Sequence, residues 1–159
     1  MINYIQEYYS KIDSGEIIVG KRIKQVYKKL VDELDHPVDN WIFDIEKANQ
    51  PIEFIETYCK NSKGKWMGKP VHLLLWQKAL LQAIYGFVDK DTGLRRCREA
   101  FVECGRKNGK STLLSGLSVF GMLSENGAQV LCSANKYQQA RIIFDEARNM
   151  VFQSPELSK

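Results

Sequence analysis

Residues 104–112 have the sequence CGRKNGKST, which ends in the Gly-Lys-Ser/Thr pattern of a phosphate-binding loop. Gly109 lets the backbone come close to a phosphate, and successive N–H groups then form a concavity that favours an anion. Lys110 can reach the β- and γ-phosphates of a nucleotide, and the Ser111 hydroxyl can bind Mg²⁺. The stretch therefore predicts a nucleotide site at the start of a helix.

The context of this short motif decides what it means. Residues 100–104 favour a strand, and residues 111–123 carry apolar side chains at helical spacing. A strand, a loop and a helix in that order are the context that the motif requires. Residues 128–133 predict a second strand, and Asn135 is a candidate cap for a helix that extends to about residue 152. This order predicts an α/β fold, a P-loop NTPase-type parallel sheet with a right-handed crossover.

The loop differs from the common pattern, which places its first glycine five positions before the second. That position is Cys104 here, and Gly105 comes one residue late. A guanidinium beside the γ-phosphate could stabilise charge in the transition state, so Arg106 is a candidate catalytic residue together with Lys110. The alternative interpretation is an ordinary basic surface turn. The candidate phosphate-binding residues are Gly105, Lys107, Asn108, Gly109, Lys110, Ser111 and Thr112.

Size and charge limit the alternatives only broadly. A chain of 159 residues suits one domain, or one domain with a small appendage. Its formal net charge of +4 permits contact with nucleic acid without requiring it. Six basic and two acidic residues lie between Arg95 and Lys110. This local excess predicts either a solvated surface or a DNA contact.

Cysteine usage and hydropathy argue against several classes of protein. The four cysteines are far apart and form no Cys-x-x-Cys pair, which disfavours a zinc site and favours reduced thiols in a cytosolic protein. The N-terminus has no apolar run behind a basic start, so no signal peptide is predicted. The apolar stretches are too short to cross a bilayer, so we expect no membrane association.

A helical segment precedes the loop region. Apolar residues at intervals of three and four predict helices over residues 2–12, 21–34, 44–60 and 77–87, with Pro51 either starting a second helix or kinking the third. Residues 61–70 are rich in glycine and lysine, and they indicate a linker. We therefore expect a helical N-terminal segment over residues 1–62 and part of a P-loop ATPase domain over residues 63–159.

Four segments of the chain occur in the order found in the large subunit of tailed-phage terminases, and the chain resembles this family. The Arg-Lys-Asn-Gly-Lys-Ser form of the loop is fairly specific to it. The likeness covers about residues 60 to 155, whereas the leader is similar only in its helical character and position. The four segments are residues 64–70, 75–77, 106–112 and 134–140.

The resemblance implies a motor ATPase that uses ATP and Mg²⁺ to package double-stranded DNA. It also implies a terminase small subunit, a portal protein and a homo-oligomeric ring as partners, in the host cytoplasm during virion assembly. Gln77 matches the family's adenine-reading glutamine, whose amide can pair with a base edge, and Trp76 could pack against the base. The alternative for this pair is a helix start with a tryptophan in the core. Whether Arg106 acts on its own subunit or on a neighbour stays open.

One expected feature is missing from the sequence. A motor of this kind needs a carboxylate for Mg²⁺ and a nearby Glu to activate water. No apolar run ending in Asp-Glu follows the loop, because Asp145-Glu146 lies inside a helical pattern. We therefore expect an N-terminal part of a longer polypeptide that also carries an endonuclease, and poor ATP hydrolysis by this part alone. The alternatives are another P-loop NTPase, such as a helicase or kinase, and a non-catalytic helical adaptor.

Overall fold

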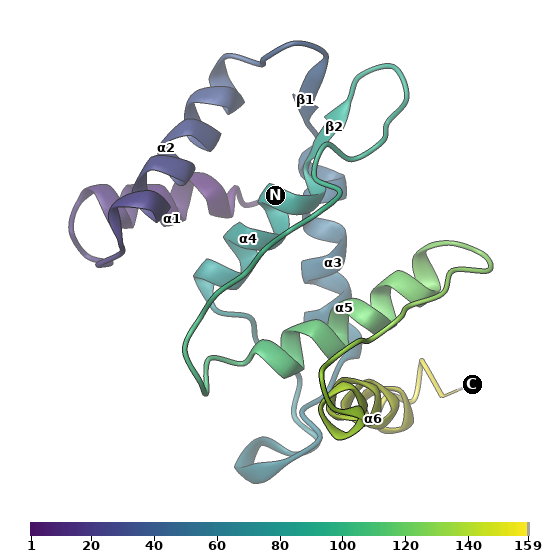
Figure 1. Cartoon of the computed structure of the whole chain (residues 1–159). Coiled ribbons are helices and arrows are strands. Elements are labelled where there is room, and N and C mark those ends of the chain that lie inside the picture. Colours follow the sequence, from purple (N-terminus) through teal and green to yellow (C-terminus); the bar gives the residue numbers. More distant parts are fainter. Residues whose placement is uncertain (159) are drawn as a thin grey trace. The chain divides into compact units, whose positions relative to one another are not determined.

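A computed structural model describes residues 1–158 and consists mainly of helices (Figure 1). Two short strands, β1 and β2, pair antiparallel. The α-helices are α1 (Tyr4–Asp13), α2 (Lys21–Asp35), α3 (Ile45–Tyr58), α4 (Leu75–Tyr85), α5 (Lys110–Ser124) and α6 (Tyr137–Gln153), with a 3-10 turn η1 (Gly64–Trp66) and the strands β1 (Trp41–Phe43) and β2 (Phe87–Asp89).

The chain divides into two compact units, each described by itself. The first unit comprises Met1–Ile52 and Leu74–Phe101, and the second comprises Glu53–Leu73 and the chain from Val102 onward. Helix α3 begins in the first unit and ends in the second. The units divide the chain differently from the predicted boundary between residues 62 and 63, because α4 packs with α1. That domain boundary stays a prediction.

The core of the first unit forms where α1 packs against α2 and α4. Ile5, Tyr8 and Ile12 lie on one face of α1, as the helical spacing predicts, and each is buried. The Tyr8 and Tyr27 rings meet edge to face at a centroid distance of 4.7 Å. Burial raises the pKa of Tyr27, so its phenol stays neutral.

A buried glutamine joins three elements of the first unit. Gln82 on α4 is fully buried, and its Oε1 accepts from the backbone N–H groups of Tyr4 (2.7 Å) and Ile5 (3.1 Å). Its Nε2 donates to the Ile2 carbonyl (2.9 Å) and to Asn49 Oδ1 on α3 (3.0 Å). The side chain thus satisfies two N–H groups at the start of α1, which have no partner within the helix.

Close helix packing defines the second unit. A side chain at Gly116 of α5 would lie 3.0 Å from Ile55 of α3, so a glycine permits this approach. The Phe54 and Phe120 rings add a contact with centroids 5.5 Å apart. The close partner of Gly116 is therefore a helix. On the other side, α5 packs against α6, where buried Ser115 Oγ donates to the Ile143 carbonyl at 3.0 Å.

The predicted α/β character is present, but the predicted parallel strands are not formed within residues 1–158. Residues 100–104 and 128–133 are extended without being paired in a sheet. The reason is that a strand completes its backbone hydrogen bonds only with a neighbouring strand, which a helix does not need. Phe101 is 93% exposed and Leu131 is 89% exposed, so neither segment buries its apolar side chains as a central strand does.

Most predicted helices are confirmed with small shifts at their ends. The helices predicted over residues 2–12, 21–34 and 111–123 correspond to α1, α2 and α5. Pro51 lies inside α3, which continues through it as one helix. The proposed Asn135 cap is wrong, since α6 begins after Lys136 and has no side-chain cap.

Candidate functional site

The predicted phosphate loop forms an exposed turn directly before α5. Lys107 and Gly109 both have left-handed backbone conformations, with φ of +65° and +71°. Such values are uncommon outside glycine and bend the chain sharply. Gly109 is the residue before the first turn of the helix. The loop therefore has the curvature that lets successive N–H groups face one point.

The Lys110 side chain folds back across the loop. Its Nζ donates to the carbonyl of Cys104 at 2.6 Å and to the carbonyl of Gly105 at 2.8 Å. The ammonium thus links the first residue of α5 to the beginning of the loop. Phosphate oxygens are stronger partners for an ammonium than neutral carbonyls are, so an anion in the loop could replace these contacts.

The Asn108 side chain forms hydrogen bonds with the backbone of the same turn. Its Nδ2 donates to the carbonyls of Gly105 (3.2 Å) and Arg106 (3.4 Å). A side chain at Gly105 would lie 3.3 Å from the same nitrogen, so a small residue suits this position. These contacts hold the loop in one shape before any ligand binds. The Arg106 side chain is exposed on this turn.

The start of α5 has the electrostatic character of an anion site. In this helix no side chain caps the N-terminus, and the first turn has no acidic residue. The N–H groups of Lys110, Ser111 and Thr112 have no partner within the helix, and they carry the positive end of the helix dipole. Ser111 is exposed, and Thr112 is half-buried. The sequence prediction of a loop and helix start with this chemistry is therefore matched in shape.

The predicted base-reading residues lie on α4, in the first unit. Gln77 is 4% exposed, and its Oε1 accepts from the Leu74 backbone N–H at 2.8 Å. Leucine has no polar side chain to return that bond, so the pair is half of a capping box. Trp76 is partly buried and packs against the core of its unit. These contacts fit the alternative of a helix start with a core tryptophan, and base reading stays a prediction.

Two residues of the predicted positive patch have partners in the first unit. Arg96 forms an ion pair with the buried Glu33 (Nη1 to Oε2, 2.8 Å) and lies 4.2 Å from the Phe87 ring centroid. The Arg95 guanidinium lies 4.6 Å from the centroid of the Tyr85 ring. Glu33 balances the charge of Arg96, so this arginine serves packing in its own unit.

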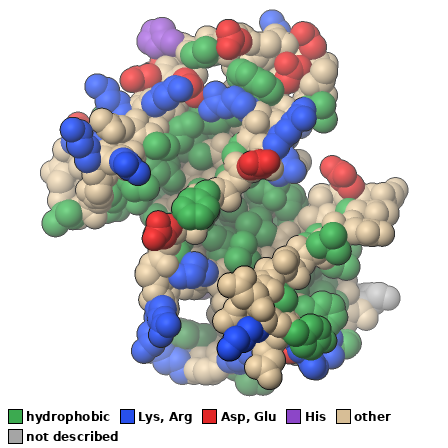
Figure 2. All heavy atoms as spheres, in the orientation of Figure 1, with side chains coloured by type: hydrophobic (Ala, Val, Ile, Leu, Met, Phe, Trp, Pro, Cys, Tyr) green, Lys and Arg blue, Asp and Glu red, His purple; other side chains and the backbone are tan. Residues whose placement is uncertain are grey.

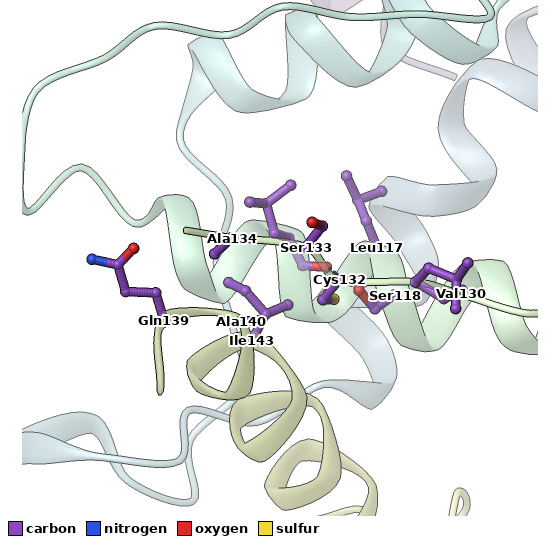
Figure 3. A pocket seen from close by; sticks show the side chains of 11 residues that line it. Leu117, Ser118, Val130, Cys132, Ser133, Ala134, Gln139, Ala140 and Ile143 are labelled. Carbon is purple, nitrogen blue, oxygen red and sulfur yellow. Dashed lines mark hydrogen bonds between the residues drawn. The ribbon is translucent and has the colours of Figure 1, made fainter. Parts of the chain in front are cut away.

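A cavity of about 510 Å³ in the second unit was not predicted from the sequence. It lies between α5, α6 and the extended segment at residues 130–134 (Figure 3). Its lining is apolar apart from Ser118, Cys132, Ser133 and Gln139, and it includes no cationic side chain. It is therefore separate in chemistry from the phosphate loop, although both belong to the same unit.

Within residues 1–158, no helix combines the length and apolar character needed to span a bilayer. No cluster of three or more His, Cys, Asp or Glu side chains suited to a metal occurs among the same residues. The Mg²⁺ contact of Ser111 stays a prediction.

The matches with known proteins all indicate the same family. Residues 75–159 match the model of the terminase large subunit, ATPase domain. The chain is 31% identical to the terminase large subunit of Enterobacteria phage HK97 over 116 residues, 71% of this chain and 22% of that protein. It is 27% identical over 161 aligned positions to the terminase large subunit of Lactococcus phage p2, which covers 98% of this chain and 28% of the relative.

The chain thus spans about a quarter of the length of these relatives. The terminase large subunit of Lactococcus phage SK1 matches to the same extent as that of phage p2. No solved structure gives a significant match. Since the family model covers more than half of the sequence, including the whole phosphate loop, the chain belongs to the terminase large subunit family and carries residues of its ATPase domain.

Proposed function

We propose that the loop at residues 104–112 binds Mg·ATP and that the chain contributes this site to a DNA-packaging motor. The observation that carries the proposal is the Lys110 ammonium, which lies across a curved, exposed loop at the open start of α5. Membership of a family of ATPase domains supports the same ligand. The loop shape, the uncapped helix start and the family support a triphosphate as the ligand.

Each loop residue has a proposed role that follows from its chemistry. The N–H groups from Gly105 to Thr112 bind phosphate oxygens, with Lys107, Asn108 and Gly109 fixing the curvature. Lys110 exchanges its two carbonyl contacts for β- and γ-phosphate oxygens, and Ser111 binds Mg²⁺. Bound Mg²⁺ would neutralise phosphate charge. Arg106, exposed on the same turn, is the candidate for charge that develops on the γ-phosphate.

For the adenine, we propose Gln77 and Trp76. Gln77 Oε1 is already bonded to the Leu74 N–H, so reading a base requires the amide to share or give up that bond. Base selectivity of this kind is large only when a buried polar group would otherwise lose its partner. ATP should therefore be preferred over GTP by a margin that Gln77→Ala reduces.

The activity of the whole motor is a further part of the proposal. It couples ATP hydrolysis to translocation of double-stranded DNA, in a homo-oligomeric ring with a small subunit and a portal protein, and an endonuclease belongs to the same polypeptide. The phosphate loop has no carboxylate between residues 104 and 112. Water activation therefore needs a carboxylate from elsewhere, and we expect this chain alone to hydrolyse ATP at background rates.

Titration calorimetry with a non-hydrolysable ATP analogue and Mg²⁺ tests the proposal. Lys110→Ala should weaken binding by about 10- to 100-fold, because a charge-assisted contact with phosphate is lost. Lys90→Ala is the matched control, since Lys90 is exposed on the first unit and the charge change is the same. Equal affinities for both variants would reject the loop as the site. A folded chain that binds no nucleotide would favour the helical adaptor.

A further inference from the structure

A basic hairpin at residues 60–70, in the second unit, has no role in the proposed nucleotide site. Residues 57–73 include four lysines and no acidic residue. Two of these lysines lie over the Trp66 ring, and every residue from Lys63 to Pro70 is exposed. In Figure 2, Lys and Arg side chains gather along the lower edge, where this hairpin lies in Figure 1. Such a concentration of charge on a small loop attracts partners of opposite sign.

The hairpin has an ordered backbone. Asn61 N donates to the Lys69 carbonyl (2.9 Å), and Gly68 N donates to the Asn61 carbonyl (2.8 Å). Asn61 Nδ2 adds bonds to the carbonyls of Lys69 (3.1 Å) and Pro70 (3.0 Å). Gly64 and Gly68 supply the left-handed turns, with φ of +71° and +77°. The loop is therefore shaped in advance, which lowers the entropy cost of binding.

Trp66 positions two of the lysines. Lys65 Nζ lies 5.1 Å and Lys69 Nζ lies 5.0 Å from the centroid of its ring. The ring's quadrupole attracts both ammonium groups, which would otherwise repel each other. Trp66 itself is 53% exposed, so the ring holds two cations at the surface and is not a core residue. Lys65 and Lys69 are therefore held close together on the ordered hairpin.

A third lysine connects the hairpin to α6. Lys63 Nζ lies 3.6 Å from Glu146 Oε2, whose side chain is 11% exposed. This contact occupies Lys63 within the unit and leaves Lys65 and Lys69 as the cations at the tip. The hairpin also belongs to the same compact unit as the phosphate loop.

From these contacts we propose that the hairpin at residues 60–70 binds the phosphate backbone of double-stranded DNA through Lys65 and Lys69, with Trp66 as the residue that positions them. The inference rests on the proposed function, which supplies the duplex as substrate. Ammonium groups bind phosphates without reading bases, so the contact should be independent of sequence. A moving motor requires that property of its contacts with DNA.

An anionic membrane is the competing partner, because Trp66 and Met67 are both exposed at the tip. A Trp ring with lysines beside it can also lie at the level of anionic headgroups, which carry phosphate too. The family of terminase ATPase domains favours the duplex as the partner, and vesicles are therefore the control.

Fluorescence anisotropy of the 159-residue chain with a labelled 30-base-pair duplex tests the inference. The double variant Lys65→Ala/Lys69→Ala should bind about 10-fold or more weakly at low salt. A plot of log affinity against log salt concentration has a negative slope, and the magnitude of this slope should decrease by about 2 in the double variant. Lys21→Ala/Lys28→Ala removes the same charge from the exposed face of α2 and should change neither quantity by as much. Trp66→Leu, which keeps both lysines, should give an intermediate loss.

The readouts separate this inference from the nucleotide site. The hairpin variants should keep the wild-type affinity for the Mg·ATP analogue and an unchanged circular dichroism spectrum, which excludes misfolding. Equal losses of duplex binding in the hairpin and α2 double variants would overturn the inference, and so would no duplex binding by the wild type. Tighter binding to vesicles of anionic phospholipid than to the duplex, lost in the hairpin variant, would also overturn it in favour of a membrane.

Discussion

The two compact units satisfy their apolar and polar groups to different degrees. In the first unit, α1 buries its apolar face, and Gln82 is fully buried with both ends of its amide bonded. In the second unit, large apolar side chains of α6 and its preceding segment stay at the surface. Phe144 is 61%, Phe152 is 70% and Leu131 is 89% exposed.

The difference follows from the kind of element in each unit. Helices complete their own backbone hydrogen bonds, and the two strands of the first unit pair with each other, so this unit needs only side-chain packing between its elements. The second unit includes the extended segment at residues 128–133 and residues 102–104 of the other, and an extended segment depends on a neighbour for both hydrogen bonds and burial. Stability should therefore be concentrated in the first unit.

The largest effect is expected at Gly86, where the first unit has no spare room. A Cβ there would collide with the Phe43 ring, and it would lie 2.7 Å from the Gln82 carbonyl and 2.8 Å from Ala48 Cβ. Gly86→Ala should lower the free energy of unfolding by at least about 3 kcal/mol. Gly121→Ala in the second unit meets only Val130 at 3.6 Å and should be neutral or stabilising by up to about 1 kcal/mol. Urea unfolding measures both, and similar losses would remove the contrast between the units.

The next effect tests the buried amide. Gln82→Leu keeps the volume but leaves the Tyr4 and Ile5 N–H groups without their acceptor, which should cost about 2 to 3 kcal/mol. Gln25→Leu on the exposed face of α2 should change stability by no more than about 0.5 kcal/mol. Thermal unfolding followed by circular dichroism compares them. A Gln82 variant as stable as the wild type would show that the four hydrogen bonds contribute nothing.

A smaller effect is expected between α5 and α6. Ser115→Ala removes the buried bond to the Ile143 carbonyl and should cost about 1 kcal/mol. Ser118→Ala on the same helix removes only a local bond to the Leu114 carbonyl, and alanine's helix propensity should offset that loss. Chemical unfolding monitored by Trp fluorescence gives the two values. A larger loss at Ser118 would contradict the assigned packing of the second unit.

The smallest effect concerns the turn after β2. Hydrogen bonds from the Thr92 N–H and hydroxyl, and from Asn40, lower the pKa of Asp89. A lowered folded-state pKa adds stability above the unfolded value, near pH 4, and this stability is lost as pH falls through the folded pKa. The melting temperature of the wild type should exceed that of Asp89→Ala at pH 7, with the gap narrowing below pH 4. A gap that does not change with pH would mean that the carboxylate charge is irrelevant.

The helices could be predicted because their signal is local. The spacing of Ile5, Tyr8 and Ile12 indicates which face of α1 is buried without reference to any partner. The strands could not be predicted in this way. Residues 128–133 have a strand-like composition, but a strand forms only where a neighbouring strand pairs with it. Gly116 shows the same limit, because its close partner, Ile55 on α3, is visible only in the structure.

The candidate site likewise has one part that the sequence predicted and another that only the structure shows. The sequence placed Gly109 and Lys110 in a loop at the start of a helix, and the structure has them there, because consecutive residues carry that signal. Their contacts with phosphate stay predictions. Gln77 was matched by position to a base reader, whereas its buried contact with Leu74 is visible only in the structure. The two lysines over Trp66 were within the segment assigned as a linker, since glycine content alone does not show an ordered turn.

The central claim is that the main-chain amides at the start of α5 hold the phosphates of a nucleotide. Two-dimensional ¹H–¹⁵N NMR of the labelled chain, titrated with Mg²⁺ and a non-hydrolysable ATP analogue, tests it most directly. The largest shifts should fall on Gly109, Lys110 and Ser111, and Lys110→Ala should raise the ligand concentration needed for half of the shift by about 10- to 100-fold. Saturating shifts confined to the cavity between α5 and α6, with these three amides unmoved, would contradict the claim.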